Sequence, residues 1–160
     1  MYTLHKNHIG TEPVQVGPYS IYAAGIMSWS GISKLHPVDV VVALTNERLH
    51  IDFGAAELVP MFLPEFGDVP NNWAHLLEEK IIAYLMDGKR VLLYCATGDG
   101  RTGATIASLI SLLEPETADP IAAVRQRHCG QAVESLAQAR NIFALRCAEL
   151  PDKYKLEFTW

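Results

Sequence analysis

Apolar and polar residues along this chain change repeatedly between strand-like and helix-like spacing. β-branched and aliphatic runs predict strands at 14–25 around a Gly-Pro turn, at 38–44, at 57–62 and at 90–95. Apolar residues at helical spacing predict helices between Asn71 and Gly88, over 103–113, from Pro120, and from about 132 to 149. Because strands and helices alternate, we expect an α/β fold with a central, mainly parallel sheet flanked by helices.

Capping residues support two of these helices. Asparagine precedes the first apolar residue of the helix that Gly88 ends. Asp119 stands directly before Pro120, which suits the first position of a helix. These signals fix where two of the predicted helices begin and where one of them ends.

Length and composition predict a single domain over residues 1–160. The chain is 49% hydrophobic, and we find no repeat, linker or low-complexity tract in it. Its formal net charge of −5 argues against binding to nucleic acid or to an anionic membrane, because both favour basic surfaces. We therefore expect any anionic substrate to be bound by a local site.

Cysteine content and hydropathy point to a cytoplasmic protein. The three cysteines are Cys95, Cys129 and Cys147, and their number and spacing fit neither a disulfide framework nor a metal site. The first ten residues lack the apolar core of a signal peptide, and no apolar run reaches the roughly 18 residues that a membrane span needs. We expect a monomer in a reducing compartment, without metal or other cofactor.

The stretch "VLLYCATGDGRTGATIASLI" (91–110) carries the candidate chemistry. A buried strand runs into a glycine-rich turn and then into the start of a helix, where backbone N–H groups and the helix dipole favour an anion such as phosphate. The candidate phosphate-binding residues are Ala96, Thr97, Gly98, Asp99, Gly100, Arg101 and Thr102.

Two chemistries use such a turn. Residues 98–105 match the nucleotide-binding pattern Gly-x4-Gly-Lys-Ser/Thr except that Ala104 stands where the pattern needs lysine, so the cation for the phosphates is missing. The other chemistry uses the cysteine, because Cys95 and Arg101 are separated by five residues and Thr102 follows. The second interpretation is favoured, although any lone cysteine at a strand end can simply be a small buried hydrophobe.

The segment CATGDGRT resembles the signature of the cysteine-based protein tyrosine and dual-specificity phosphatases. Five residues can curl so that their N–H groups converge on one tetrahedral anion, with the Cys95 sulfur below phosphorus and the Arg101 guanidinium across two oxygens. In such surroundings the pKa of a cysteine thiol can fall from about 8.5 to roughly 3.5–7.5, which creates a nucleophile. Thr102 could also hydrogen-bond the sulfur.

The resemblance extends beyond this loop. Residues 18–28 and 38–44 resemble the family's first strands, and 122–145 resembles its closing helical pair. Within that pair, the resemblance implies that Gln138 orients the hydrolytic water; the alternative is a polar residue on an exposed helix face. Cys129 and Cys147 lack similar company and are expected to pack between helices.

The resemblance also implies a general acid on a loop before the nucleophile, because a leaving oxygen departs more easily once protonated. The segment "MFLPEFGDVPNN" offers Glu65 and Asp68. Asp68 has the usual residue type, whereas Glu65 fits the family's register with one extra residue. We predict Asp68, with Glu65 as the alternative; both could instead be solvated loop acids.

Two positions depart from the family pattern. Tyr94 occupies the place where many relatives carry a histidine that orients the loop. Asp99 introduces a carboxylate into the middle of the loop, where it would repel polyanionic substrates unless its side chain faces away.

Together these features predict a phosphatase that hydrolyses phosphate monoesters, most simply phosphotyrosine or phosphoserine/threonine in proteins, through a phosphocysteine. One alternative is a pseudophosphatase that binds phosphate without turnover. A second is an enzyme for a non-protein substrate, such as a nucleic-acid 5′-phosphate, a lipid or a small molecule. A third is sulfur transfer through a persulfide on Cys95.

Overall fold

The computed structural model describes residues 9–25, 38–46 and 54–159. The strands in these ranges are β1 (Ile9–Val16), β2 (Tyr19–Gly25), β3 (Val40–Ala43), β4 (Glu57–Pro60) and β5 (Val91–Cys95). The helices are α2 (Trp73–Leu77), the π-helical turn η2 (Glu78–Ile82), α3 (Ala83–Met86), α4 (Gly100–Leu113), α5 (Pro120–Arg127), α6 (Leu136–Ala144) and α7 (Asp152–Glu157). The last part of the first family-like segment, 26–28, lies outside the described residues.

The strands form one sheet in the order β1-β2-β5-β3-β4. β1 and β2 are antiparallel and joined by a tight turn in which Gly17 adopts φ +55°, a conformation that favours glycine. The other neighbours are parallel, with β5 between β2 and β3. The predicted α/β fold with a mainly parallel sheet flanked by helices is thus confirmed.

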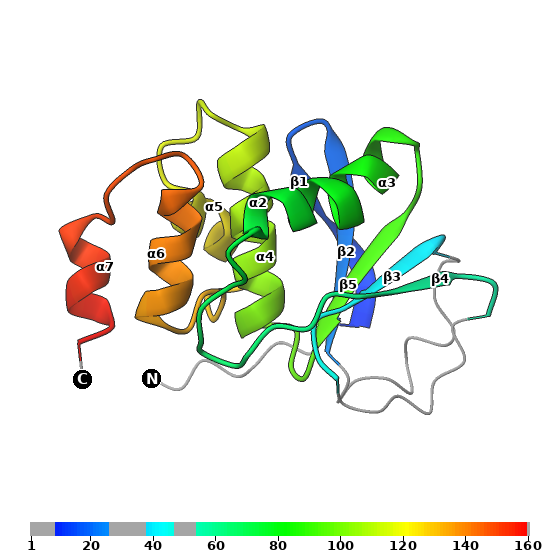
Figure 1. Cartoon of the computed structure of the whole chain (residues 1–160), viewed down its shortest axis with the longest axis horizontal. Helices are drawn as coiled ribbons and strands as arrows, with labels where there is room; N and C mark the ends of the chain where they lie inside the picture. Colours follow the sequence, from blue (N-terminus) through cyan, green and yellow to red (C-terminus); the bar gives the residue numbers. More distant parts are fainter. Residues whose placement is uncertain (1–8, 26–37, 47–53, 160) are drawn as a thin grey trace.

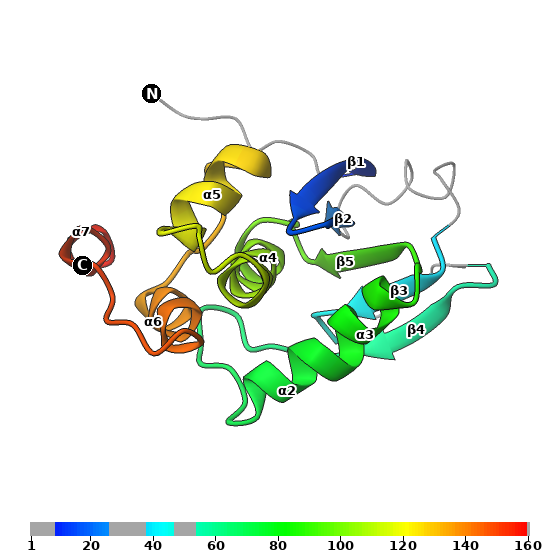
Figure 2. The same cartoon turned by 90° about the horizontal axis from the view of Figure 1, so that it is seen from above.

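The described helices lie on one side of the sheet (Figures 1 and 2). Alternate residues of β5 face them: Val91, Leu93 and Cys95 belong to the main apolar core, whereas Leu92 and Tyr94 belong to a second cluster on the opposite face. α4 crosses the middle of the helical layer and is buried along most of its length. The turn between β5 and α4 is therefore flanked by two elements that are both buried in the core.

Most predicted elements are present, and the predicted helix between Asn71 and Gly88 appears as the continuous run α2–η2–α3. The Asp119 cap is confirmed, because its Oδ1 accepts a 3.0 Å hydrogen bond from the amide of Ala122. Asn72 precedes α2 but makes no side-chain capping bond. The strand predicted over 57–62 ends at Pro60.

The helix predicted over about 132–149 is wrong at both ends. α6 begins only at Leu136, because Val133 has φ +67° and the Ser135 hydroxyl caps the helix by accepting from the Gln138 amide at 3.2 Å. It ends at Ala144, and Cys147 has φ +55° in the turn that follows. This difference leaves 128–135 as a connection of turns and irregular structure that reaches the glycine-rich turn.

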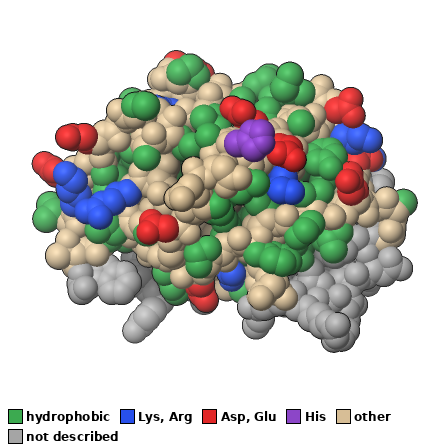
Figure 3. Space-filling model, in the orientation of Figure 1, with side chains coloured by type: hydrophobic (Ala, Val, Ile, Leu, Met, Phe, Trp, Pro, Cys, Tyr) green, Lys and Arg blue, Asp and Glu red, His purple; other side chains and the backbone are tan. Residues whose placement is uncertain are grey.

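Charged side chains do not form a basic stripe on the face seen in Figure 3, where lysines and arginines lie among acidic, polar and apolar groups. None of the described helices has the length and apolar character of a membrane span. Within the same ranges, acidic, histidine and cysteine side chains do not gather into a group of three that could bind a metal.

Glu114 ties the β1–β2 turn to the helical layer. Its carboxylate accepts hydrogen bonds from the amide of Gly17 (2.7 Å), from the Arg127 guanidinium (2.7 and 2.9 Å) and from the hydroxyl of Thr117 (2.7 Å). The Arg127 hydrogen bonds are the main reason why the pKa of this nearly buried carboxyl is lowered to about 2, with Gly17 and Thr117 acting in the same direction.

Glu114→Gln is expected to lower the free energy of unfolding at neutral pH by about 1–3 kcal/mol, since charged hydrogen bonds at a buried site are lost. A lowered native pKa stabilises the fold above the unfolded-state value of 4.5, and this contribution is lost as pH falls from 4.5 toward about 2. Urea unfolding from pH 7 to pH 3 should therefore show the two proteins converging. Glu149→Gln at an exposed position is the control; equal stability of the Glu114 variant at pH 7 would contradict this role.

Candidate active site

Cys95 ends β5 on the core side of the sheet, and its side chain is buried. The turn after it is closed by Gly98, which adopts φ +83° and donates its amide hydrogen to the Cys95 sulfur over 3.2 Å. An N–H directed at sulfur stabilises a thiolate more than a neutral thiol. The turn predicted from sequence thus places a backbone donor on the proposed nucleophile.

Close packing requires small residues around this turn. A Cβ on Gly25, at the end of β2, would lie 2.4 Å from the carbonyl oxygen of Thr97. A Cβ on Gly103, in the first turn of α4, would lie 2.5 Å from the Cβ of Ala132. The turn is therefore held from one side by β2 and from the other by the connection between α5 and α6.

Asp99 precedes the first residue of α4 and faces away from the turn's open side. Its side chain is buried, makes no capping bond to the helix, and accepts a 3.3 Å hydrogen bond from the Cys129 thiol. Burial, followed by the charge of Asp99, raises the pKa of Cys129 to about 12, so Cys129 stays a thiol at neutral pH. Of the two arrangements considered for Asp99, the structure shows the one in which its carboxylate does not face a bound anion.

A pocket opens over the turn at the start of α4. Its lining residues are Glu65, Cys95, Ala96, Thr97, Gly100, Arg101, Glu134 and Gln138. The structure therefore brings Cys95 and Arg101 to one pocket, together with part of the predicted phosphate-binding loop. Gly98, Asp99 and Thr102 are buried behind its surface.

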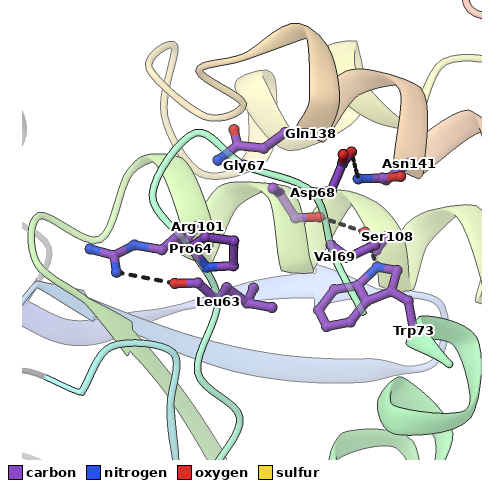
Figure 4. Close-up of a pocket in the computed structure, with 11 residues that line it drawn as sticks. Leu63, Pro64, Gly67, Asp68, Val69, Trp73, Arg101, Ser108, Gln138 and Asn141 are labelled. Carbon is purple, nitrogen blue, oxygen red and sulfur yellow. Dashed lines mark hydrogen bonds between the residues drawn. The ribbon is translucent and has the colours of Figure 1, made fainter. Parts of the chain in front are cut away.

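Arg101 supplies a positive charge to the pocket. Its side chain is partly buried, and its Nη1 donates to the carbonyl oxygen of Leu63 at 3.4 Å (Figure 4). This bond is long, and it joins the guanidinium to the segment that carries the two candidate acids. An anion in the pocket offers Arg101 a stronger, charged acceptor than this carbonyl.

The two candidate acids occupy different places. Glu65 lines the pocket that contains Cys95. Asp68 lines a neighbouring hollow that shares Arg101 and Gln138 with that pocket, and it points toward Asn141, whose amide donates to it at 3.4 Å (Figure 4). Both side chains are exposed. Glu65 therefore shares a pocket with the Cys95 sulfur, whereas Asp68 does not.

Gln138 is buried rather than displayed on an exposed helix face. It lines the Cys95 pocket, and its side-chain oxygen accepts a 2.7 Å hydrogen bond from the amide of Glu134. This bond leaves the amide nitrogen of Gln138 as the end of the side chain that can turn toward a ligand or a water.

Thr102 does not make the predicted hydrogen bond to the Cys95 sulfur, and Tyr94 lies on the other face of the sheet. The hydroxyl of Thr102 is fully buried and finds no hydrogen-bond partner among the described residues, so the bond to the Cys95 sulfur is not formed here. Tyr94 packs in the apolar cluster on the opposite face of the sheet, and burial raises its pKa to about 12. It therefore contributes to the core from the side away from Cys95.

Sequence reasoning missed two residues of the α5–α6 connection. Glu134 lines the pocket, and its carboxylate oxygens would lie 2.7 and 2.9 Å from a Cβ placed on Gly100. His128 lies behind the turn, with Nε2 2.7 Å from the carbonyl oxygen of Gly98. Both lie about 30 residues beyond the turn in sequence, and the only signal for them was that their segment resembled the family's closing helical pair.

No family model matches the sequence, and no curated protein matches it. Solved structures do match. The structure of Tk-PTP in its active form has a TM-score of 0.66 at 17% identity and aligns 84% of this chain with 95% of its own. Human DUSP28 has a TM-score of 0.64 at 13% identity and aligns 88% of this chain with 96% of its own. DUSP15 has a TM-score of 0.66 at 12% identity and aligns 92% of this chain with 96% of its own. The chain therefore has the fold of the compact, dual-specificity-like cysteine phosphatases.

Proposed function

We propose that this protein is a cysteine-dependent phosphatase that hydrolyses phosphate monoesters in proteins. The observation that carries the proposal is the pocket at the start of α4, where Cys95 and Arg101 meet above a turn whose Gly98 amide donates to the sulfur. Its position in a fold shared with Tk-PTP and DUSP15 supports the same chemistry. We also propose that the protein is monomeric and cytoplasmic, with one domain over residues 1–160.

The proposed reaction has two displacements at phosphorus. The Cys95 thiolate attacks phosphorus, the bond from phosphorus to the ester oxygen breaks, and the general acid gives its proton to that oxygen. Arg101 and N–H groups of the loop 96–102, other than the Gly98 N–H that is directed at the sulfur, bind the other phosphate oxygens throughout. Water then attacks the phosphocysteine, the same carboxylate accepts a proton from it, and sulfur leaves as thiolate. Gln138 is proposed to orient this water.

Charge around the pocket bears on the substrate. Among the described residues, Glu65 and Glu134 line it together with one cation, Arg101, and Asp68 lies beside it. Carboxylates around one guanidinium disfavour polyanions, because each added phosphate increases the repulsion. An isolated phosphate on tyrosine, serine or threonine suits this balance better than a polyphosphorylated lipid or a nucleic-acid end.

Two alternatives use the same pocket without this reaction. A phosphate-binding pseudophosphatase would need neither a nucleophilic cysteine nor an acid, yet Cys95 and Glu65 both line the pocket. A persulfide carrier would use Cys95 but would not need Arg101 at this spacing. The presence of all three groups therefore favours phosphate hydrolysis.

Cys95→Ser is expected to lower turnover of an aryl phosphate by about 10³-fold or more, since a hydroxyl is far less acidic than a thiol and a poorer nucleophile. Fold and tungstate binding should persist because the two side chains differ little in size. Rates are measured in EDTA, with Cys147→Ser at an exposed cysteine as the matched control. Full activity of the Cys95 variant, or turnover that requires added metal, would show a different class of enzyme.

The acid is tested by comparing Glu65→Gln with Asp68→Asn. The sequence favoured Asp68, whereas the pocket lining favours Glu65, so we expect the Glu65 variant to lose about 10²–10⁴-fold on phosphotyrosine and much less on a nitrophenyl ester, whose leaving oxygen needs little protonation. The Asp68 variant should keep most of its activity on both substrates. A selective loss in Asp68→Asn instead would mean that the loop moves to bring Asp68 over the sulfur.

A further inference from the structure

Gly98 makes two hydrogen bonds, one through its N–H and one through its carbonyl oxygen. Its N–H donates to the Cys95 sulfur at 3.2 Å, and its carbonyl oxygen lies 2.7 Å from Nε2 of His128. A carbonyl oxygen can only accept, so His128 must carry a hydrogen on Nε2. The sulfur of the proposed nucleophile and the His128 ring are thus connected through a single residue.

Gly98 gains from this support because glycine restricts the backbone less than any other residue type. It has φ +83°, a region that glycine enters easily and can leave as easily, and it is buried. Rotation of the peptides on either side of Gly98 would turn its N–H away from the sulfur. It would also leave the buried carbonyl oxygen of Gly98 without a hydrogen bond, which is unfavourable.

His128 is well placed to hold the turn because α5 fixes the backbone of His128. It is the residue that follows α5, and its amide donates to the carbonyl of Val124 at 2.8 Å. The next residue, Cys129, donates its thiol to Asp99 at 3.3 Å. Two consecutive residues of the connection therefore bind two consecutive residues of the turn, 98 and 99.

We propose that His128 is a positioning residue for the Cys95 nucleophile: by donating from Nε2 to the Gly98 carbonyl, it keeps the Gly98 N–H directed at the sulfur. This role rests on the proposed phosphatase function, since it concerns the same cysteine. It gives the residue that follows α5, a helix that contributes no residue to the pocket lining, an effect on the reactivity of the sulfur that acts through Gly98.

The test measures the thiol itself as well as turnover. His128→Leu keeps an apolar bulk but removes the donor, whereas His128→Gln offers an amide N–H near the position of Nε2. His75→Gln is the control, because His75 is exposed and pairs with Glu79 in the run α2–η2–α3. Alkylation by iodoacetamide at pH 7 is followed by peptide mass spectrometry, so that Cys95 is quantified separately from Cys129 and Cys147.

We expect Cys95 of the His128→Leu variant to be alkylated about tenfold more slowly, and kcat with an aryl phosphate to fall by a similar factor, because the Gly98 N–H is no longer held toward the sulfur. His128→Gln should stay within about twofold of the unchanged protein in both measurements. Folding of each variant is checked by circular dichroism and thermal unfolding. If the leucine variant does not fold, the glutamine variant carries the test alone.

Unchanged Cys95 alkylation in a folded His128→Leu variant would overturn the proposal, and so would a tenfold loss in a folded His128→Gln variant. Either result leaves the phosphatase proposal intact, because that depends on the Cys95→Ser comparison. Conversely, an inactive enzyme whose Cys95 alkylation still depends on the Nε2 donor would support the positioning role and contradict the phosphatase function.

Discussion

The hydrogen bond from the Gly98 amide to the Cys95 sulfur is the interaction on which the proposed chemistry depends. It can form only if the chain reverses within three residues of the end of β5, and the reversal needs a residue that tolerates φ +83°. The same reversal directs the start of α4 at the pocket, so the helix dipole and the free N–H groups act where the thiolate and a phosphate would lie.

The rest of the fold holds this turn at fixed points. β5 is the central strand, so its carboxyl end is fixed by β2 on one side and β3 on the other. Gly25 of β2 lies against Thr97, and Gly103 lies against Ala132 of the α5–α6 connection. These contacts leave no room for a side chain at either glycine. A phosphate would therefore meet a preformed site, which lowers the cost of binding it in the reactive geometry.

The sequence was informative where chemistry and local spacing coincide. Strand, turn and helix around Cys95 could be predicted because buried aliphatic runs, glycines and a five-residue spacing are all local. His128 and Glu134 could not, since they meet the turn through tertiary packing. The choice between Glu65 and Asp68 depends on which way one exposed loop faces, and Val133, with φ +67°, interrupts the beginning of a pattern that otherwise looks helical.

The step that distinguishes the proposed enzyme is the transfer of phosphate to the Cys95 sulfur. It is tested most directly by mixing the protein with an aryl phosphate, quenching in acid within the first turnover, and mapping the peptides by mass spectrometry. We expect one phosphoryl group on the peptide that contains Cys95 and none on that peptide in Cys95→Ser. Release of phosphate by the unchanged protein at full rate, with phosphate found on another residue or on none, would contradict it.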